Sequence, residues 1–161
     1  MPERKSSDEK EAERAFQRHK RRLIRVLGRQ ALFSDQIDGV GRALFGQHWG
    51  GVHHQNSFKA VKRPGGTYAV LNTAMTDTSP GVHWIGVYVS PVGVVHVWDS
   101  FGRDTKHLAW PMRRNATQRG FGFEGSDRDA QQRGASQTCG PQSLAWLATV
   151  RELGIRKAML V

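Results

Sequence analysis

The chain has 161 residues, of which 38% are hydrophobic, with a single cysteine and a net charge of +10. This length and composition predict one compact domain and exclude a disordered chain, while one cysteine excludes a disulfide framework and a thiolate-rich zinc site. No apolar run approaches the roughly 20 residues of a membrane span and the charged N-terminus is unlike a signal peptide, so we expect a soluble protein in a reducing compartment, without a membrane partner.

Half of the net charge lies in residues 1–30, which carry ten Lys or Arg and five Asp or Glu. We expect these residues to form a basic, partly helical extension ahead of a domain over 31–161. A basic cluster attracts polyanions, DNA above all, or acts as a nuclear-import signal; the alternative is a solvated helix face that only aids solubility. The side chains that we single out for nucleic-acid binding are Arg18, Lys20, Arg21, Arg22 and Arg25.

The N-terminal half of the chain predicts one helix and a long loop. Residues 12–28 have helical apolar spacing that ends at Gly28, while residues 1–11 are polar and predicted to be disordered. Residues 34–66 are glycine-rich, so we expect a loop that lines a narrow cleft. Three histidines in this loop have no acid or thiol beside them, which argues against a metal site at His48, His53 and His54.

The central segment predicts a sheet. Residues 67–73 fit a buried strand, and residues 82–89 and 94–98 fit two strands joined by a Pro-Gly turn, hence an antiparallel hairpin. Residues 111–137 are polar and predicted to be mostly loop. A helix over 140–153 follows, so we expect an α+β fold in which a small mixed or antiparallel sheet, with the hairpin at its centre, packs against this last helix.

The only cysteine, Cys139, immediately precedes that helix. Pro141 suits a first helical turn, where its missing N–H is not needed. The positive end of the helix macrodipole lowers the pKa of a thiol placed there, which makes Cys139 a nucleophile candidate. The alternative is that Cys139 is a small buried hydrophobic residue.

The predicted hairpin supplies partners for the thiol. A register that pairs position 83 with position 99 across an odd-length turn places His83 and Asp99 on one face, whereas an even-length turn places them on opposite faces. A carboxylate beside a histidine fixes its tautomer and supports the imidazolium. His83, Asp99 and Cys139 then form a catalytic triad in that chain order, with no cofactor required for the chemistry.

A triad also needs donors for the oxyanion. Backbone N–H groups at Cys139 and Gly140 are one source, and a side-chain amide is the other. Three glutamines lie just upstream of the cysteine, and the chemistry alone does not choose among Gln131, Gln132 and Gln137.

Four segments in this order resemble the adenain-like family, the adenovirus-type viral maturation cysteine proteases, which are related to the SUMO-deconjugating proteases. Residues 67–74 with 81–84 resemble its histidine region, and residues 99–102 resemble its acid motif, although adenain commonly has Glu where this chain has Asp99. Gln132 lies seven residues before Cys139, which matches the spacing of the family's oxyanion-hole glutamine. The Cys139-Gly140 pair before a helix matches the nucleophile motif.

The resemblance implies a cysteine endopeptidase that cuts viral precursor polypeptides at glycine-containing sites during virion maturation. It implies His83, Asp99 and Cys139 as catalytic residues and Gln132 in the oxyanion hole. It also implies a monomer that works in the virion and the host nucleus and is activated by DNA. A disulfide-linked peptide cofactor, which adenain can use, is excluded because no second cysteine is present.

Two other functions stay open at this point. A peptidase that removes ubiquitin or SUMO would accept the Gly-Gly end of such a modifier in the same narrow cleft. A nucleic-acid-binding virion protein with an inactive protease fold would need only the basic surface. In addition, residues 37–41 fit the family's cleavage pattern, so Val40–Gly41 is either a self-cleavage site or part of a glycine turn.

Overall fold

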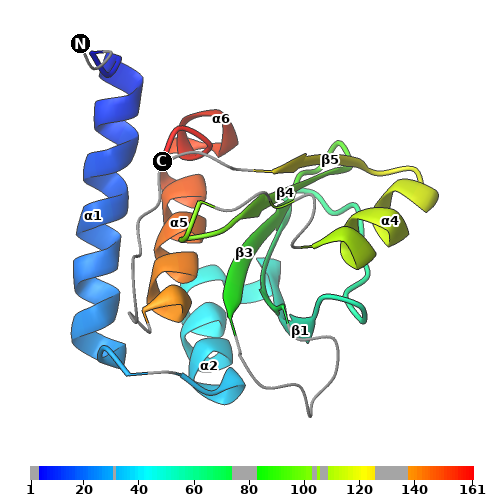
Figure 1. Ribbon diagram of the computed structural model, residues 1–161, viewed down its shortest axis with the longest axis horizontal. Coiled ribbons are helices and arrows are strands. Elements are labelled where there is room, and N and C mark those ends of the chain that lie inside the picture. Colours follow the sequence, from blue (N-terminus) through cyan, green and yellow to red (C-terminus); the bar gives the residue numbers. More distant parts are fainter. Residues whose placement is uncertain (1–3, 31, 74–82, 103–104, 106–108, 126–137) are drawn as a thin grey trace.

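The computed structural model describes residues 4–30, 32–73, 83–102, 105, 109–125 and 138–161 (Figure 1). A five-stranded sheet in the order β1-β2-β3-β4-β5 forms its middle. Helix α5 packs on β3, α1 packs along α5 on the side away from the sheet, and α4 lies at the other end of the molecule. The predicted α+β class is confirmed.

Helix α1 (Ser7–Leu27) begins earlier than the sequence predicts. The side chain of Ser6 accepts a hydrogen bond from the Glu9 N–H, and Asp8 and Glu9 occupy the first turn, where acidic side chains stabilise a helix. Disorder over residues 1–11 is therefore wrong for residues 7–11. Gly28, at φ 83°, ends the helix as predicted, and its N–H donates to the Ile24 carbonyl.

The predicted loop over 34–66 contains helix α2 (Ser34–Phe45), a short 3-10 turn η1 (Gly46–His48) and strand β1 (Trp49–His54). Helix α2 was not predicted because Gly39 and Gly41 lie within it and glycine is a poor helix former. Gly41 is needed for packing, since a Cβ there would lie 2.2 Å from Cζ2 of Trp49. Residues 55–66 lack regular structure, as predicted.

The sheet is mixed. Strand β2 (Thr67–Asn72) pairs in parallel with β1 and antiparallel with β3 (Trp84–Val89). Strands β3 and β4 (Val94–Trp98) form the predicted antiparallel hairpin, and β4 pairs in parallel with β5 (Gly122–Gly125). The expected loop over 111–137 is therefore wrong at β5 and at helix α4 (Trp110–Gln118). Most residues of α4 are polar, and its buried side consists of Met112 and Ala116.

Helix α5 (Cys139–Leu153) is the centre of the core. Every residue from Cys139 to Val150 is buried, because the sheet covers one side and α1 covers the other. The Trp146 ring stacks on Trp98 at 6.1 Å, and Phe16 of α1 lies 5.3 Å from Trp98. Helix α1 is thus part of this core. Helix α6 (Ile155–Ala158) follows, and none of the described helices is long and apolar enough to cross a membrane.

Candidate active site

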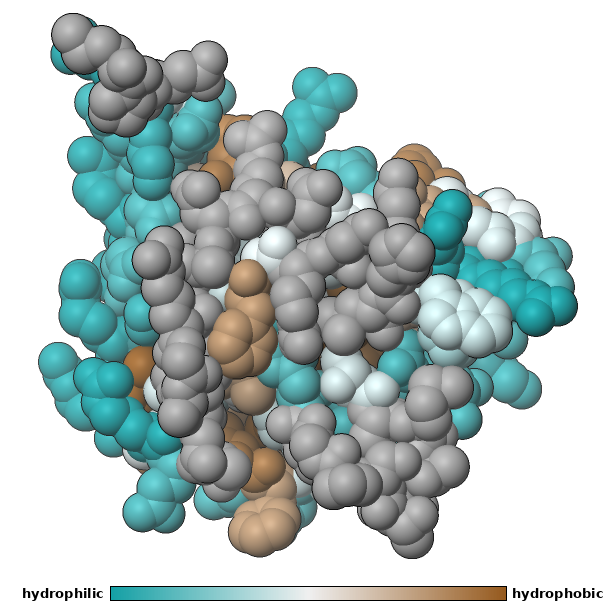
Figure 2. Space-filling model, viewed as in Figure 1, coloured by the Kyte–Doolittle hydropathy of each residue, from teal (hydrophilic) through white to brown (hydrophobic). Residues whose placement is uncertain are grey.

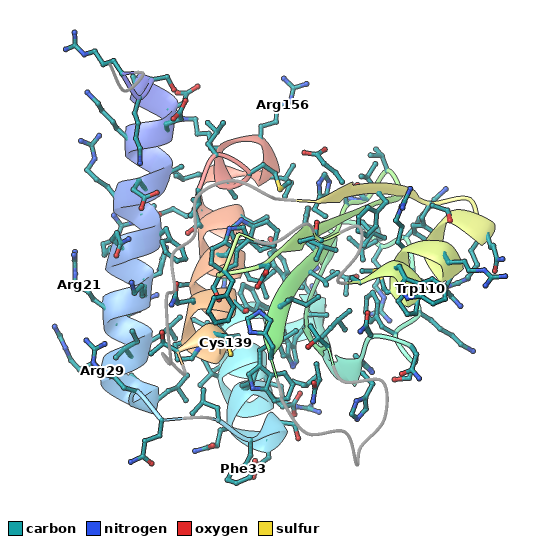
Figure 3. All side chains as sticks on the ribbon, in the orientation of Figure 1. Arg21, Arg29, Phe33, Trp110, Cys139 and Arg156 are labelled. Carbon is teal, nitrogen blue, oxygen red and sulfur yellow. The ribbon has the colours of Figure 1, made fainter. Side chains whose placement is uncertain are left out.

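Cys139 is the first residue of α5, and 7% of its surface is exposed. Figure 3 shows it at the end of the helix that faces the start of β3. The next residue must be small, since a Cβ on Gly140 would lie 3.0 Å from Leu32 and 3.3 Å from Ile37. The nucleophile candidate therefore lies at a close junction of α5, α2 and the segment before α2.

His83 immediately precedes β3, and Asp99 immediately follows β4. The register pairs Gly86 with Trp98, so position 99 lies opposite 85, and the predicted direct pairing of 83 with 99 is wrong by two residues. Both registers have the same parity, so the two side chains still share a face as diagonal neighbours. Nε2 of His83 bonds Oδ1 of Asp99, as the triad requires.

Asp99 is held on several sides. It is 1% exposed, and its Oδ1 also accepts the backbone N–H of Phe101 at 3.3 Å. The Phe101 ring lies 4.9 Å from the His83 ring and covers it. Because Nε2 of His83 faces Asp99, Nδ1 is the ring nitrogen left for the hydrogen bond with Cys139.

The surroundings of Cys139 favour the thiolate. Burial raises the pKa of the thiol, but hydrogen bonds from His83 and from the backbone N–H groups of Trp84 and Gly140 lower it by more. The net pKa lies below that of an ordinary cysteine. The Gly140 donor belongs to the first turn of α5, where N–H groups have no partner within the helix.

The pKa of His83 is shifted in the opposite direction to that of Cys139. Burial lowers its pKa, while the hydrogen bonds to Asp99 and Cys139 raise it by more, so the net pKa is raised. A lowered thiol pKa beside a raised imidazole pKa favours a thiolate–imidazolium pair. This arrangement can supply both a nucleophile and a proton donor for acyl transfer.

The oxyanion donors are only partly described. Gln131, Gln132 and Gln137 all lie outside the described residues, so the choice of Gln132 stays a prediction. Gln142 is described, but its amide donates at 2.8 Å to Oγ1 of Thr138, the residue that precedes the helix. Backbone N–H groups at the start of α5 remain as donors near the sulfur.

In comparisons with known proteins, no protein-family model matches the chain, and no curated protein matches it. The resemblance to adenain-like proteases therefore stays a prediction from the sequence motifs.

A groove lies beside the triad, between α2 and β1. One cavity of about 380 Å³ includes Trp84, whose backbone N–H bonds Cys139, and an adjoining cavity of about 520 Å³ extends along α2. Both share Ser34, Val52 and His53, so they form one groove. The expected lining by glycines holds for Gly46, Gly50 and Gly51. The side chains of α2 were missed because that segment was predicted to be loop.

Two of the three histidines of this region, His48 and His53, contact backbone carbonyl groups. Nδ1 of His48 lies 3.3 Å from the Gly66 carbonyl, and Nε2 of His53 lies 2.6 Å from the Gly50 carbonyl. Among the described residues, no three potential metal ligands gather in one place.

The five basic residues predicted to bind nucleic acid do not share one environment. Arg18 pairs with Glu152 of α5, and Nη2 of Arg22 lies 2.9 Å from Nδ1 of His19. Burial and the nearby Arg29 lower the pKa of Lys20, which is only partly exposed. Arg21 and Arg25 are exposed.

A wider set of arginines nevertheless occupies one side of α1. Helical periodicity places five exposed arginines on that side, opposite buried Phe16 and Leu23, and exposed Arg29 follows the end of the helix. We call this set the α1 arginine face; it consists of Arg14, Arg18, Arg21, Arg22, Arg25 and Arg29. Figure 3 shows Arg21 and Arg29 pointing away from the body of the protein, and the same edge is hydrophilic in Figure 2.

The Val40–Gly41 bond lies inside α2, so the predicted glycine turn is wrong. Ile37 is fully buried, and Gly41 lies against Trp49. Cleavage of this bond would require α2 to unfold, because a protease needs an extended substrate backbone.

Proposed function

We propose that the protein is a cysteine endopeptidase in which Cys139 is the nucleophile, His83 the acid and base, and Asp99 the residue that orients His83. The observation that carries the proposal is the buried chain of contacts from Asp99 through His83 to Cys139, with pKa shifts of opposite sign on the last two. A merely buried cysteine needs none of these partners.

The reaction follows from this arrangement. The Cys139 thiolate attacks the scissile carbonyl carbon, and the negative charge moves to the carbonyl oxygen, which backbone N–H groups of α5 and, by the resemblance, Gln132 stabilise. The C–N bond then breaks, and His83 gives its proton to the leaving amine. Water, deprotonated by His83, hydrolyses the thioester and releases the acid and the thiol.

The groove between α2 and β1 supports a peptide substrate, because it is long and leads to the residue that contacts Cys139. By resemblance, we propose viral precursor polypeptides cut at glycine-containing sites during virion maturation, in the virion and the host nucleus. The α1 arginine face supports DNA or another polyanion as a partner, since five exposed arginines on a helix of 21 residues, with Arg29 just beyond its end, can follow a phosphate backbone.

The same groove supports a second candidate, the removal of ubiquitin or SUMO. One experiment separates these activities. Purified protein is incubated with an internally quenched peptide that contains a glycine site and, separately, with a modifier fused through its Gly-Gly end to a reporter. We expect cleavage of the peptide and none by Cys139→Ala; cleavage of the fusion alone would identify a deconjugating enzyme.

Failure to cut either substrate, with DNA present or absent, would count against both activities if Cys139 also reacts like an ordinary thiol. The third candidate, an inactive fold that binds nucleic acid, would then be favoured. Cys139→Ser is the control for Cys139→Ala, because serine nearly keeps the size of the side chain and so separates loss of the thiol from loss of structure.

A further inference from the structure

A second basic surface lies at the end of the molecule opposite α1. It combines the exposed side of α4 with neighbouring residues of β5 and of the 55–66 segment, and Figure 3 shows its tryptophan far from Arg21 and Arg29. We call it the cationic platform; its members are Lys62, Trp110, Arg113, Arg114, Arg119, Phe121 and Phe123.

The cations of this platform are positioned by aromatic rings. The Arg119 guanidinium lies 5.7 Å and the Lys62 ammonium 5.9 Å from the Phe121 ring centre. The Arg113 guanidinium lies 6.0 Å from the Phe123 ring centre. Cation–π contacts of this kind hold the charges in place while leaving them open to solvent.

Carboxylates do not neutralise these charges in the part of the chain that the structure describes. Glu124 is the acidic residue of β5, and it lies 3.7 Å from His96 of β4. None of the ion pairs between described residues includes Lys62, Arg113 or Arg119. Among the described residues, the charges of Lys62, Arg113 and Arg119 therefore have no carboxylate partner.

Trp110 adds an exposed ring to this charge. The structure describes all five tryptophans, and Trp110, at 52% exposure, is the one that is exposed. Helical spacing places Trp110, Arg113 and Arg114 on one side of α4, while Met112 and Ala116 are buried on the other. A flat ring thus lies next to two guanidinium groups on the same helix surface.

We propose that the cationic platform binds single-stranded nucleic acid, with Trp110 stacked on an unpaired base and the arginines on phosphates. Base–aromatic stacking needs a base that is free of its duplex, which a single strand provides. The α1 arginine face has no exposed aromatic ring, so its chemistry suits phosphates alone. The two ends of the molecule would then bind different forms of nucleic acid.

The test measures the affinity of the full chain, by fluorescence anisotropy, for a short labelled oligothymidylate and for a duplex of equal length. We expect Trp110→Ala to weaken single-strand binding by about fivefold or more and to leave duplex binding within about twofold. Trp110→Phe keeps a ring and should retain most of the single-strand affinity. An oligouridylate tests whether the platform distinguishes ribose from deoxyribose. Binding of either the oligothymidylate or the oligouridylate supports the proposal.

Charge variants separate the two surfaces. Arg113→Glu with Arg114→Glu should weaken single-strand binding, whereas Arg21→Glu with Arg25→Glu should mainly weaken duplex binding. Single strands should also quench tryptophan fluorescence in the wild type and not in Trp110→Phe. The proposal is overturned if the α4 variants bind single strands like the wild type, or if Trp110→Ala weakens duplex binding equally. All five altered residues are exposed, and circular dichroism checks folding.

Discussion

The hydroxyl of Ser143 donates a hydrogen bond to the Trp84 carbonyl at 3.1 Å, one helical turn after Cys139. Ser143 is fully buried, and Trp84 follows His83 directly. This bond therefore fixes the helix that begins at Cys139 against the strand that directly follows His83. If Cys139 is the nucleophile, this makes Ser143 a positioning residue, because its hydroxyl bonds the backbone of Trp84.

We expect Ser143→Ala to lower kcat by about tenfold while KM changes little, because the reacting groups lose alignment. Thr149→Val is the matched control, since the Thr149 hydroxyl bonds the Ala145 carbonyl within α5. Both variants lose one buried hydrogen bond and should lose about 1 kcal/mol of stability. Equal effects of the two variants on kcat would contradict the positioning role.

The pH dependence of Cys139 alkylation follows from the lowered pKa of the thiol. A thiolate persists down to its own pKa, so labelling by iodoacetamide should stay fast below the ordinary thiol value of 9.0 and fall at a lower pH than the labelling of an unperturbed thiol. Mass spectrometry across pH measures this. Protein unfolded in denaturant is the control, and an identical profile in both states would show that the thiol is ordinary.

Replacing Asp99 by Asn tests whether the carboxylate of Asp99 contributes to the lowered pKa of Cys139. Loss of the carboxylate should lower the pKa of His83, which weakens the imidazolium and raises the pKa of Cys139. Labelling near neutral pH should then fall about tenfold for each pKa unit of the rise. An unchanged profile would mean that Asp99 only fills space beside His83.

The two glycines of α2 predict opposite effects on stability. Gly41→Ala should destabilise the fold by about 1–3 kcal/mol, because its Cβ would overlap the Trp49 ring. Gly39→Ala should stabilise it by about 0.5–1 kcal/mol, since no atom lies within 4 Å of its Cβ and alanine favours a helix. Urea unfolding of both variants measures the contrast, and a loss of stability in Gly39→Ala would contradict it.

The groove can be tested without altering the triad. Val52 lines both of its cavities, so Val52→Phe should raise KM for a peptide substrate by about fivefold and leave kcat nearly unchanged. Alkylation by iodoacetamide, which is too small to need the groove, should not change. If the larger ring leaves KM as it was, the peptide lies elsewhere.

Local patterns in the sequence were sufficient to predict the β3–β4 hairpin, helix α5 and the contact between His83 and Asp99. The hairpin register was missed by two positions because the turn was counted one residue early. Gly93 adopts φ 86°, so it must lie inside the turn, and Ser90 closes the turn by bonding the Val94 backbone.

Helix α2 and the groove could not be predicted from local sequence patterns, because both depend on tertiary packing. The need for Gly41 arises only when Trp49 packs on it, and that contact joins segments whose composition alone predicts a loop. Helix α4 was missed for a related reason, because its buried side consists of only Met112 and Ala116.

The single thiol determines how the protein responds to oxidation. A lowered pKa increases the fraction of thiolate, which attacks an oxygen of hydrogen peroxide; the O–O bond breaks, hydroxide leaves, and a sulfenic acid forms. With no second cysteine in the chain, that acid has no partner with which to close an internal disulfide. Repair must come from a thiol outside the molecule, so the reducing power of the surroundings would set how much of the protein can act.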